Sequence, residues 1–301
     1  MNPWSPEIEL STHDAICLII NQFPELSPLK ISLLGQGFDN TVFMVNDQFV
    51  FRFPRRTIAS DLLITENRLL PHLTNFLNLQ IPEPVFFGQP CKEYPWPFTG
   101  YQVVSGVTPG ILSETERNAS AGQLAMFLRT LHQFPIEKAK SYDVPYDQLN
   151  RVSIETRKEK LEENVKKAMD DRLLKNPKAI MEYLNNLKIV EENTDLALVH
   201  GDLHFRNILV NPQGHISGII DWGDVHIGNP AVDLSFVYSF FPHSGRKQFF
   251  EIYGEVDAKT QYLARFKAIY TTVMLLRYAH DLSDSKFKEA ALQSLNMALD
   301  D

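Results

Sequence analysis

The chain has 301 residues, 44% of them hydrophobic, and a formal net charge of -8. This size allows a substantial core in one large domain or two lobes, and the acidic balance argues against a nucleic-acid partner. No apolar run approaches the roughly 20 residues of a membrane-spanning helix, and no signal peptide is expected. The two cysteines, Cys17 and Cys91, lack metal-site spacing, and we expect them to be buried small residues of a cytoplasmic protein.

The first hundred residues predict a mainly antiparallel sheet with one or two helices. Ser11 to Phe23 has the cap and the acidic first turn of a short helix, and a second helix should begin near Thr57. A glycine-bearing turn at residues 35–40 could lay backbone amides over phosphates, although an ordinary hairpin turn fits equally well. Strands are expected at residues 31–34, 42–45, 48–53, 85–87 and 98–104.

The second half is predicted to be largely helical. Ser113 to Glu116 has the form of a capping box, and apolar residues then recur at helical spacing up to Pro135. His132 at the end of this pattern is expected to be a structural histidine rather than a ligand. Further helices are expected at residues 154–174, 177–190, 230–240, 259–280 and 283–299.

The most informative stretch runs from Leu196 to Asp233. Two short apolar runs flank the polar string His200-Gly201-Asp202-Leu203-His204-Phe205-Arg206-Asn207, which predicts a strand, a loop and a strand. A turn then sends the chain back through an apolar arm to Asp221, so the hairpin would bring Asp221 beside Asp202 and Asn207. Two carboxylates and an amide oxygen at one end of a hairpin suit Mg²⁺, which substrate phosphates often complete.

A kinase site needs three such groups. One carboxylate orients the attacking hydroxyl group and takes its proton, while an amide and a second carboxylate hold the metal against the nucleotide phosphates. Asp202 precedes Asn207 by five positions, the step that separates aspartate from asparagine in the protein-kinase catalytic loop. The pattern therefore predicts Asp202 as the catalytic base and Asn207 and Asp221 as metal ligands.

These motifs resemble those of the aminoglycoside phosphotransferase-like small-molecule kinases, relatives of macrolide and choline kinases. Arg206 departs from the pattern, since many members carry glycine there. The resemblance implies an α+β, bilobal protein-kinase-like fold, with a nucleotide-binding antiparallel sheet lobe at residues 1–105 and a mostly helical lobe at residues 106–301 that carries the catalytic loop and the acceptor site. The matching residues are His200-Gly201-Asp202-Leu203-His204, Asn207, Ile220-Asp221-Trp222-Gly223-Asp224 and Gly228-Asn229-Pro230-Ala231-Val232-Asp233.

The resemblance also implies how the nucleotide phosphates are held. Arg52 on the third strand would clamp them, and Glu66 on the following helix would fix Arg52 in place. Arg52 stands where lysine is usual, and an unrelated surface ion pair is the alternative interpretation. The turn before the second strand would cover the phosphates with Gly35, Gly37, Phe38 and Asn40.

A hinge between the lobes would hold the nucleotide base. By resemblance, backbone groups of Gln102, Val103 and Val104 would meet the base there. Tyr101 would either crowd the back of the base pocket, as in antibiotic kinases that use GTP, or serve as a core aromatic of the sheet. The expected cofactors are therefore ATP or GTP together with Mg²⁺.

Four further motif residues are expected to support the site. By resemblance, Asp233 would accept hydrogen bonds from the backbone of the catalytic loop, and His200 would brace the same loop. His204 would either support the loop or lie near phosphate. Asp224 would either support the metal site or contact substrate.

The function that this implies is transfer of the γ-phosphoryl group of ATP or GTP to a hydroxyl group of a small molecule, first of all an aminoglycoside or macrolide antibiotic. Asp281 and Asp284 could line the acidic acceptor cleft of the aminoglycoside kinases. A metabolic alcohol such as choline or homoserine, and a nucleotide-binding regulator without transfer activity, remain alternatives. The expected partners are a nucleoside triphosphate and an alcohol acceptor, with a monomer or homodimer and no membrane. The last helices also carry the basic residues Lys267, Arg277, Lys286 and Lys288.

A dimetal phosphoesterase is the rival class of enzyme. Gly201-Asp202-Leu203-His204 also resembles its GDxH element, and His215 and His226 could be further ligands. Those enzymes need a later Gly-Asn-His, where this chain has Gly228-Asn229-Pro230. The sequence therefore favours the kinase.

Overall fold

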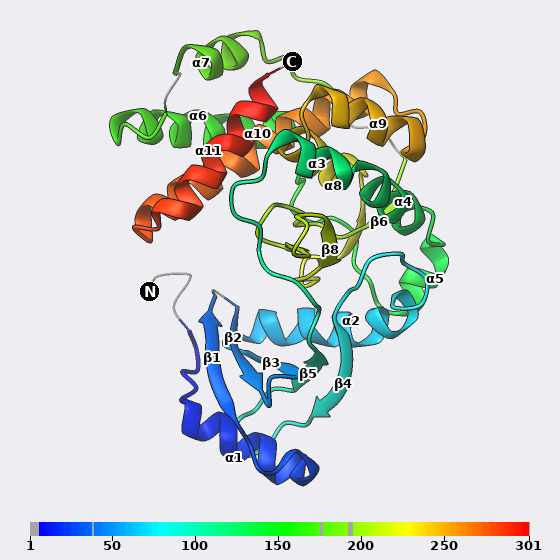
Figure 1. Ribbon diagram of the computed structural model, residues 1–301, viewed down its shortest axis with the longest axis vertical. Helices are drawn as coiled ribbons and strands as arrows, with labels where there is room; N and C mark the ends of the chain where they lie inside the picture. The colour runs from blue at the N-terminus through cyan, green and yellow to red at the C-terminus, as the bar shows by residue number, and fades with distance from the viewer. Residues whose placement is uncertain (1–5, 38, 175–176, 192–194, 301) are drawn as a thin grey trace.

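The computed structural model describes residues 6–37, 39–174, 177–191 and 195–300. Its first half contains a five-stranded antiparallel sheet of strand order β1-β2-β3-β5-β4 (Figure 1). Helices α1 (Thr12–Gln22) and α2 (Thr57–Leu73) pack on this sheet, and a short 3-10 turn (Pro24–Leu26) follows α1. The strands are β1 (Ile31–Gln36), β2 (Asn40–Val45), β3 (Phe49–Pro54), β4 (Glu83–Gly88) and β5 (Phe98–Gln102).

Alternation along β3 separates the core of the sheet from the site. Phe51 and Phe53 are fully buried and share a core cluster with Phe43, Phe98 and the apolar residues of α1. Because successive side chains of a strand point to opposite faces, Arg52 lies on the other face, where it meets Glu66 of α2. The same alternation that builds the aromatic core therefore directs one arginine toward the second half of the molecule.

The second half is mainly helical, with two small antiparallel sheets. One sheet pairs β6 (Ala197–Val199) with β9 (His226–Gly228), and the other pairs β7 (Ile208–Val210) with β8 (Ile216–Ile219). In Figure 1 these strands lie between the N-terminal sheet and the large helices. The helices are α3 (Glu114–Ala119), α4 (Ala121–His132), α5 (Ile136–Ser141), α6 (Ile154–Asp170), α7 (Pro177–Asn186), α8 (Ala231–Phe240), α9 (His243–Tyr253), α10 (Ala258–Asp281) and α11 (Ser285–Leu299).

Helix α8 is the centre of this half, since all ten of its residues are buried. Helices α10 and α11 pack against it, and α10 also packs against α6. None of the helices in the described ranges is both long and apolar enough to cross a membrane. The antiparallel sheet in the first half and the helices in the second confirm the predicted α+β, bilobal kinase-like fold.

Several expected boundaries were wrong. Strand β1 continues through Gly35 and Gln36, because both residues pair with β2, while β5 ends at Gln102. The helical pattern after Ser113 is interrupted at Ser120, whose side chain instead accepts a hydrogen bond from the backbone of Ile216. Helices α5 and α9 and strand β9 were not anticipated.

The expectation that both cysteines are buried was also wrong. Cys17 is exposed and Cys91 is partly buried. Both are free thiols, and Cys17 lies on the outer side of α1, with its sulfur 3.8 Å from His13 Nε2 one helical turn earlier. Cys17 is exposed because α1 buries a different face, formed by Ala15, Leu18 and Ile19.

Candidate active site

The loop between β6 and β7, together with the end of β8, brings three predicted site residues together. Asn207 Nδ2 donates hydrogen bonds to the main-chain oxygen of Asp202 at 2.8 Å and to Asp202 Oδ2 at 3.2 Å. The backbone N–H of Ile220 donates to the main-chain oxygen of Asn207 at 2.9 Å. Asp221 is therefore the residue that leaves the hairpin directly beside Asn207.

Asp202 is charged and partly open to solvent. Its side chain is 39% exposed, and its Oδ2 lies 3.4 Å from His204 Nε2. Because His204 Nδ1 accepts from the backbone N–H of Arg206, Nε2 is the nitrogen that carries the proton toward Asp202. Burial alone would raise the pKa of Asp202, but His204, Lys267 and His200 outweigh it and lower the pKa below its usual value.

Asp221 is held in an uncommon backbone conformation. Its φ of 65° lies in the left-handed region, which costs a non-glycine residue about 1–3 kcal/mol. The side chain is 54% exposed, and its Oδ1 accepts a hydrogen bond from Arg52 Nη2 at 2.9 Å. This backbone conformation is unfavourable by itself, and it places the carboxylate of Asp221 opposite β3.

Arg52 connects the two halves of the molecule. Its Nη1 donates to both carboxylate oxygens of Glu66, at 3.0 and 3.2 Å, while Nη2 donates to Asp221. Glu66 is only 1% exposed. Burial would lower the pKa of Arg52, but the carboxylates of Glu66 and Asp221 raise it, so the guanidinium keeps its charge.

The oxygens beside Arg52 fit a magnesium ion. Asn207 uses its Nδ2 on Asp202 and Asp221 uses its Oδ1 on Arg52, so among the described residues Asn207 Oδ1 and Asp221 Oδ2 accept no hydrogen bond. Two hard oxygen ligands completed by water and phosphate oxygens are a common arrangement for Mg²⁺. The donor set therefore suits the predicted metal.

The ligand cluster of a dimetal phosphoesterase is not assembled. Within the described ranges, no group of three or more His, Cys, Asp and Glu side chains could hold a metal ion. His226 Nδ1 instead lies 2.7 Å from the main-chain oxygen of Asp224. This arrangement disfavours the rival class of enzyme.

A buried carboxylate at the start of α8 locks the catalytic loop. Asp233 is fully buried and accepts from the backbone N–H groups of His200 at 2.7 Å and Gly201 at 3.0 Å, and it lies 3.2 Å from His132 Nε2. Gly201 has φ of 91°, and a Cβ there would lie 2.1 Å from the main-chain oxygen of Asp224. Only glycine can occupy this position.

His200 adds a second brace. Its Nε2 donates to the main-chain oxygen of Ile220 at 3.1 Å, and its Nδ1 accepts from the backbone N–H of Asp202. The ring packs edge to face on Trp222 at 4.9 Å, and Trp222 is fully buried against Phe127. The loop and the hairpin end are thus held to each other by one imidazole.

Asp224 belongs to a charge cluster that sequence patterns did not reveal. Arg151 Nη2 donates to Asp224 Oδ1 at 2.6 Å, and Arg151 Nη1 donates to Asp147 Oδ1 at 2.7 Å. Asp147 also accepts from the backbone of Leu149. No local pattern could have indicated this contact, because Arg151 precedes Asp224 by 73 residues.

The glycine-bearing turn between β1 and β2 is short and braced. The N–H of Gly37 donates to the main-chain oxygen of Asn40 at 2.9 Å, and Arg55 Nη1 donates to the main-chain oxygen of Gly37 at 2.7 Å. Arg56 forms an ion pair with Asp39. Both arginines therefore hold the turn. The expected site residue Phe38 lies outside the described residues.

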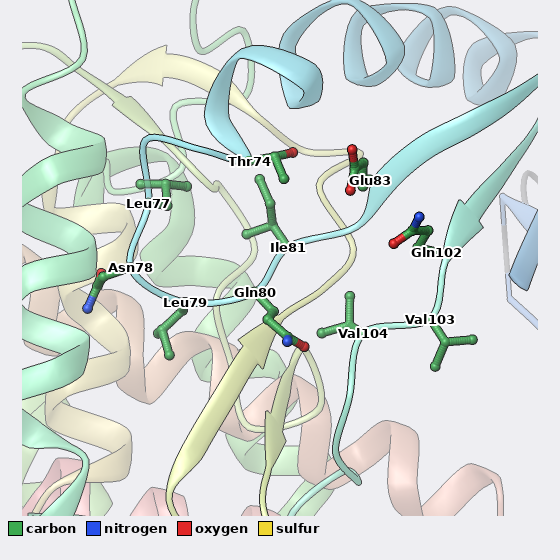
Figure 2. A pocket seen from close by; sticks show the side chains of 10 residues that line it. All are labelled: Thr74, Leu77, Asn78, Leu79, Gln80, Ile81, Glu83, Gln102, Val103 and Val104. Atoms are coloured by element: carbon green, nitrogen blue, oxygen red, sulfur yellow. The ribbon is translucent and has the colours of Figure 1, made fainter. Parts of the chain in front are cut away.

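The expected hinge borders a pocket of about 290 Å³. Figure 2 shows the side chains of Gln102 and Val104 extending toward the segment between α2 and β4, whereas Val103 points away. Tyr101 is 2% exposed and lies in the core cluster that contains the leucines of α2. Asp202, Asn207 and Asp221 do not line this pocket, whose walls are Thr74, Leu77, Asn78, Leu79, Gln80, Ile81, Glu83, Gln102, Val103 and Val104.

The two acidic residues expected at the acceptor cleft lie where α10 meets α11. Asp281 is the last residue of α10, and Asp284 caps α11 by accepting from the backbone N–H of Phe287 at 3.0 Å. The Phe287 ring lies 5.7 Å from the ring of Phe205, and Arg206 stacks on it at 4.5 Å. This junction therefore borders the catalytic loop.

Comparisons with known proteins agree with this geometry. A family model described as a phosphotransferase enzyme family matches residues 30–269. The chain is 31% identical over 128 residues to an aminoglycoside 3'-phosphotransferase of Streptomyces ribosidificus, covering 40% of this chain and 45% of that protein. It is 28% identical over 109 residues to the uncharacterized protein YcbJ of Bacillus subtilis strain 168, 35% of each. The chain thus spans less than half of these relatives' lengths.

Solved structures match over much more of the chain. The GDP and kanamycin complex of APH(2'')-IIIa is 27% identical with a TM-score of 0.68, covering 96% of this chain and 98% of the other. The GDP complex of wild-type aminoglycoside 2'-phosphotransferase-IIIa is 27% identical with a TM-score of 0.69, covering 96% and 99%. Macrolide 2'-phosphotransferase type I, at 19% identity and a TM-score of 0.59, shares the fold. Because the family match extends from the first strand of the sheet into α10, this protein belongs to the phosphotransferase enzyme family.

Proposed function

We propose that this protein transfers the γ-phosphoryl group of ATP or GTP to a hydroxyl group of a small molecule. The observation that carries the proposal is the pairing of Asp202 with Asn207 directly beside Asp221. Asp202 would orient the attacking hydroxyl and accept its proton as the new O–P bond forms. The bond from the γ-phosphorus to the bridging oxygen would break, and the nucleoside diphosphate would leave.

The metal and the phosphates would occupy the space between the hairpin and β3. Asn207 Oδ1 and Asp221 Oδ2 would hold Mg²⁺, which when bound neutralises the phosphate charge. Arg52, positioned by Glu66, would bind the phosphates from the sheet side. Asp221 would then exchange its contact with Arg52 for the metal. The 35–40 turn would cover the phosphates with Gly35, Gly37, Phe38 and Asn40.

The nucleotide base would lie at the hinge. We propose that backbone groups of Gln102, Val103 and Val104 bind it, and that the buried Tyr101 closes the back of its pocket. The hinge divides residues 1–105 from residues 106–301, because Val107 exchanges backbone hydrogen bonds with Val210 of the helical half. The GDP in the descriptions of two solved relatives favours GTP as donor, and ATP is the alternative donor.

The acceptor has two candidate classes. The descriptions of the relatives favour an aminoglycoside, for which Asp281 and Asp284 would be binding residues, and a macrolide is a further antibiotic candidate. A metabolic alcohol that carries an anionic group, such as homoserine, is favoured by a different observation, the positive charge of Lys267 that acts on Asp202. In every case His200, His204, Asp224 and Asp233 would support the loop rather than react.

A transfer assay tests the proposal. Purified protein is incubated with Mg²⁺ and either ATP or GTP, alone and with aminoglycosides, macrolides and amino alcohols. We expect phosphorylation of at least one acceptor and slow nucleotide hydrolysis without acceptor, both lost in Asp202→Asn. A protein that binds nucleotide but neither hydrolyses it nor transfers phosphate would instead be a regulator.

A further inference from the structure

Lys267 of α10 is a partly buried cation that interacts electrostatically with Asp202. Burial lowers the pKa of Lys267, and Arg151 and Arg157 act in the same direction, whereas Asp202 and Asp224 raise it. In the part of the chain that the structure describes, no carboxylate lies within 4.0 Å of Lys267 Nζ, so the ammonium has no ion-pair partner.

A second cation accompanies Lys267. Lys267 Nζ lies 5.9 Å and Arg157 Cζ lies 5.7 Å from the centroid of the Tyr270 ring, so two positive groups share one aromatic side chain. Arg157 donates to the main-chain oxygens of Asn150 and Leu149 but, among the described residues, to no carboxylate. We call Arg157, Lys267 and Tyr270 the cation pair site.

The third cation of this region is already neutralised. Arg151 donates to Asp147 and Asp224 and therefore has two carboxylate partners. Among the described residues, Lys267 has no such carboxylate partner. A charge removed from water is unfavourable unless a counter-charge compensates it, and the carboxylate of Asp202 already interacts with Asn207 and His204.

The cation pair site comes from other elements than the residues expected to hold the phosphates. The nucleotide side is marked by Arg52 of the sheet, which reaches Asp221. Lys267 and Tyr270 come instead from α10, which packs against α6, the helix that carries Arg157. The end of α10 and the start of α11 reach the catalytic loop through Phe287 and Phe205. A molecule whose hydroxyl meets Asp202 from this side would pass these cations.

We propose that Lys267 and Arg157 bind an anionic group of the acceptor, a carboxylate or a phosphate, while Asp202 receives the proton of the acceptor's hydroxyl group. The acceptor is then a small hydroxylated anion, because a polycationic aminoglycoside would meet two uncompensated positive charges. This inference rests on the phosphotransferase function proposed above. The chemical step is the same phosphoryl transfer, because the anionic group of the acceptor is bound and does not react.

The test compares acceptors that differ in charge. Hydroxylated carboxylates such as glycerate, hydroxylated phosphates such as glycerol 3-phosphate, their neutral parent glycerol, and kanamycin are assayed with Mg²⁺ and ATP or GTP. We expect kcat/KM for at least one anionic compound to exceed that of glycerol and kanamycin by tenfold or more. Comparison of the hydroxylated carboxylates with the hydroxylated phosphates shows which anion the site binds. Equal or better use of kanamycin or glycerol, or transfer to no anion, would overturn the proposal.

Variants separate binding from folding and from the general reaction. Lys267→Gln should raise KM for the anionic acceptor about 10- to 100-fold, the range for loss of a hydrogen bond to a charged group, with a smaller change in kcat. Lys267→Arg should restore most of the affinity. Lys259→Gln, at an exposed position of the same helix, is the matched control and should leave KM unchanged. A fall in kcat for every acceptor alike in Lys267→Gln would count against anion binding, whereas loss of all transfer in the unmodified protein would contradict the phosphotransferase function itself.

Discussion

Asp202 receives two hydrogen-bond donors on one oxygen, the amide of Asn207 and the imidazole of His204. Both hold the carboxylate in place without using its capacity to take a proton. We therefore expect Asp202→Asn to lower kcat by about 10² to 10⁴, the usual contribution of a general base, while nucleotide affinity is retained. Turnover assays and calorimetric titration with nucleotide measure the two quantities. Unchanged turnover would exclude Asp202 as the base.

Asp233 makes the stability of the loop depend on pH. Burial opposes ionisation of this carboxyl, but its hydrogen bond from His132, the electrostatic influence of His132 and His200 and the backbone N–H of Gly201 lower its pKa below the unfolded value near 4. A lowered folded pKa means that the carboxylate stabilises the fold above about pH 4, and that this contribution is lost as the pH falls through the folded pKa.

The variant Asp233→Asn tests this contribution. Its amide can no longer accept hydrogen bonds from His200, Gly201 and His132 together. We therefore expect the free energy of unfolding to fall by about 2–3 kcal/mol at pH 7. Denaturant unfolding of both proteins between pH 7 and pH 3 is the measurement. The difference in the free energy of unfolding between the two proteins should become smaller below pH 4. A difference that stays constant with pH would contradict the role assigned to Asp233.

Among the elements, α11 connects a helix cap to the catalytic loop. Asp284 accepts from the first turn of this helix, and Phe287 in that turn packs on Phe205. We expect Asp284→Ala to destabilise the protein by about 1 kcal/mol, because it removes the cap, and Asp284→Asn to be nearly neutral, because asparagine also caps helices. Thermal melts compare the variants. If Asp284 instead binds a cationic acceptor, Asp284→Asn raises the acceptor KM at unchanged stability.

Local patterns predicted most elements but not those that depend on distant partners. The expected start of α1 was correct, because the cap and the acidic residue that indicate it lie in the first turn of the helix itself. Ser120 breaks a continuous apolar pattern because Ile216, 96 residues later, needs its hydroxyl. Strand β9 is three residues long and exists only by pairing with β6. The residues around Ser120 and around β9 carry no pattern that indicates the helix break or the strand.

The residues of the candidate site also fall into two groups, those brought together by local sequence and those that depend on distant segments. The residues gathered by one hairpin and its loop, Asp202, Asn207 and Asp221, could be predicted because a turn of known length brings them together. The position of Arg151, and the one proposed for Lys267, could not, since each comes from a segment far away in the sequence. Their positions follow from the packing of α6 and α10, which apolar periodicity does not specify.

For the whole molecule, one contact between the halves that involves the candidate site is the bridge from Glu66 through Arg52 to Asp221. Magnesium would compete with Arg52 for the carboxylate of Asp221, and the nucleotide phosphates would compete with Asp221 for Arg52. We expect Mg²⁺ with a non-hydrolysable nucleotide to stabilise the protein by about 3 kcal/mol at 100 times its Kd, and Mg²⁺ alone to have little effect.

Asp221→Ala should remove the magnesium-dependent part of this stabilisation, measured as a shift in Tm with and without metal. Asp61→Ala, at an exposed position of α2, is the matched control and should respond as the unmodified protein does. If magnesium strengthens nucleotide binding equally in Asp221→Ala, Asp221 is not its ligand.

The indole of Trp222 gives this protein an internal optical reporter. It is one of three tryptophans, is shielded from water, and touches the imidazole that fastens the catalytic loop. In a protein whose other tryptophans, Trp4 and Trp96, are replaced by phenylalanine, light emission would come from this ring alone. Its wavelength and intensity would then record, in real time and without an attached dye, each rearrangement of the loop as substrates arrive.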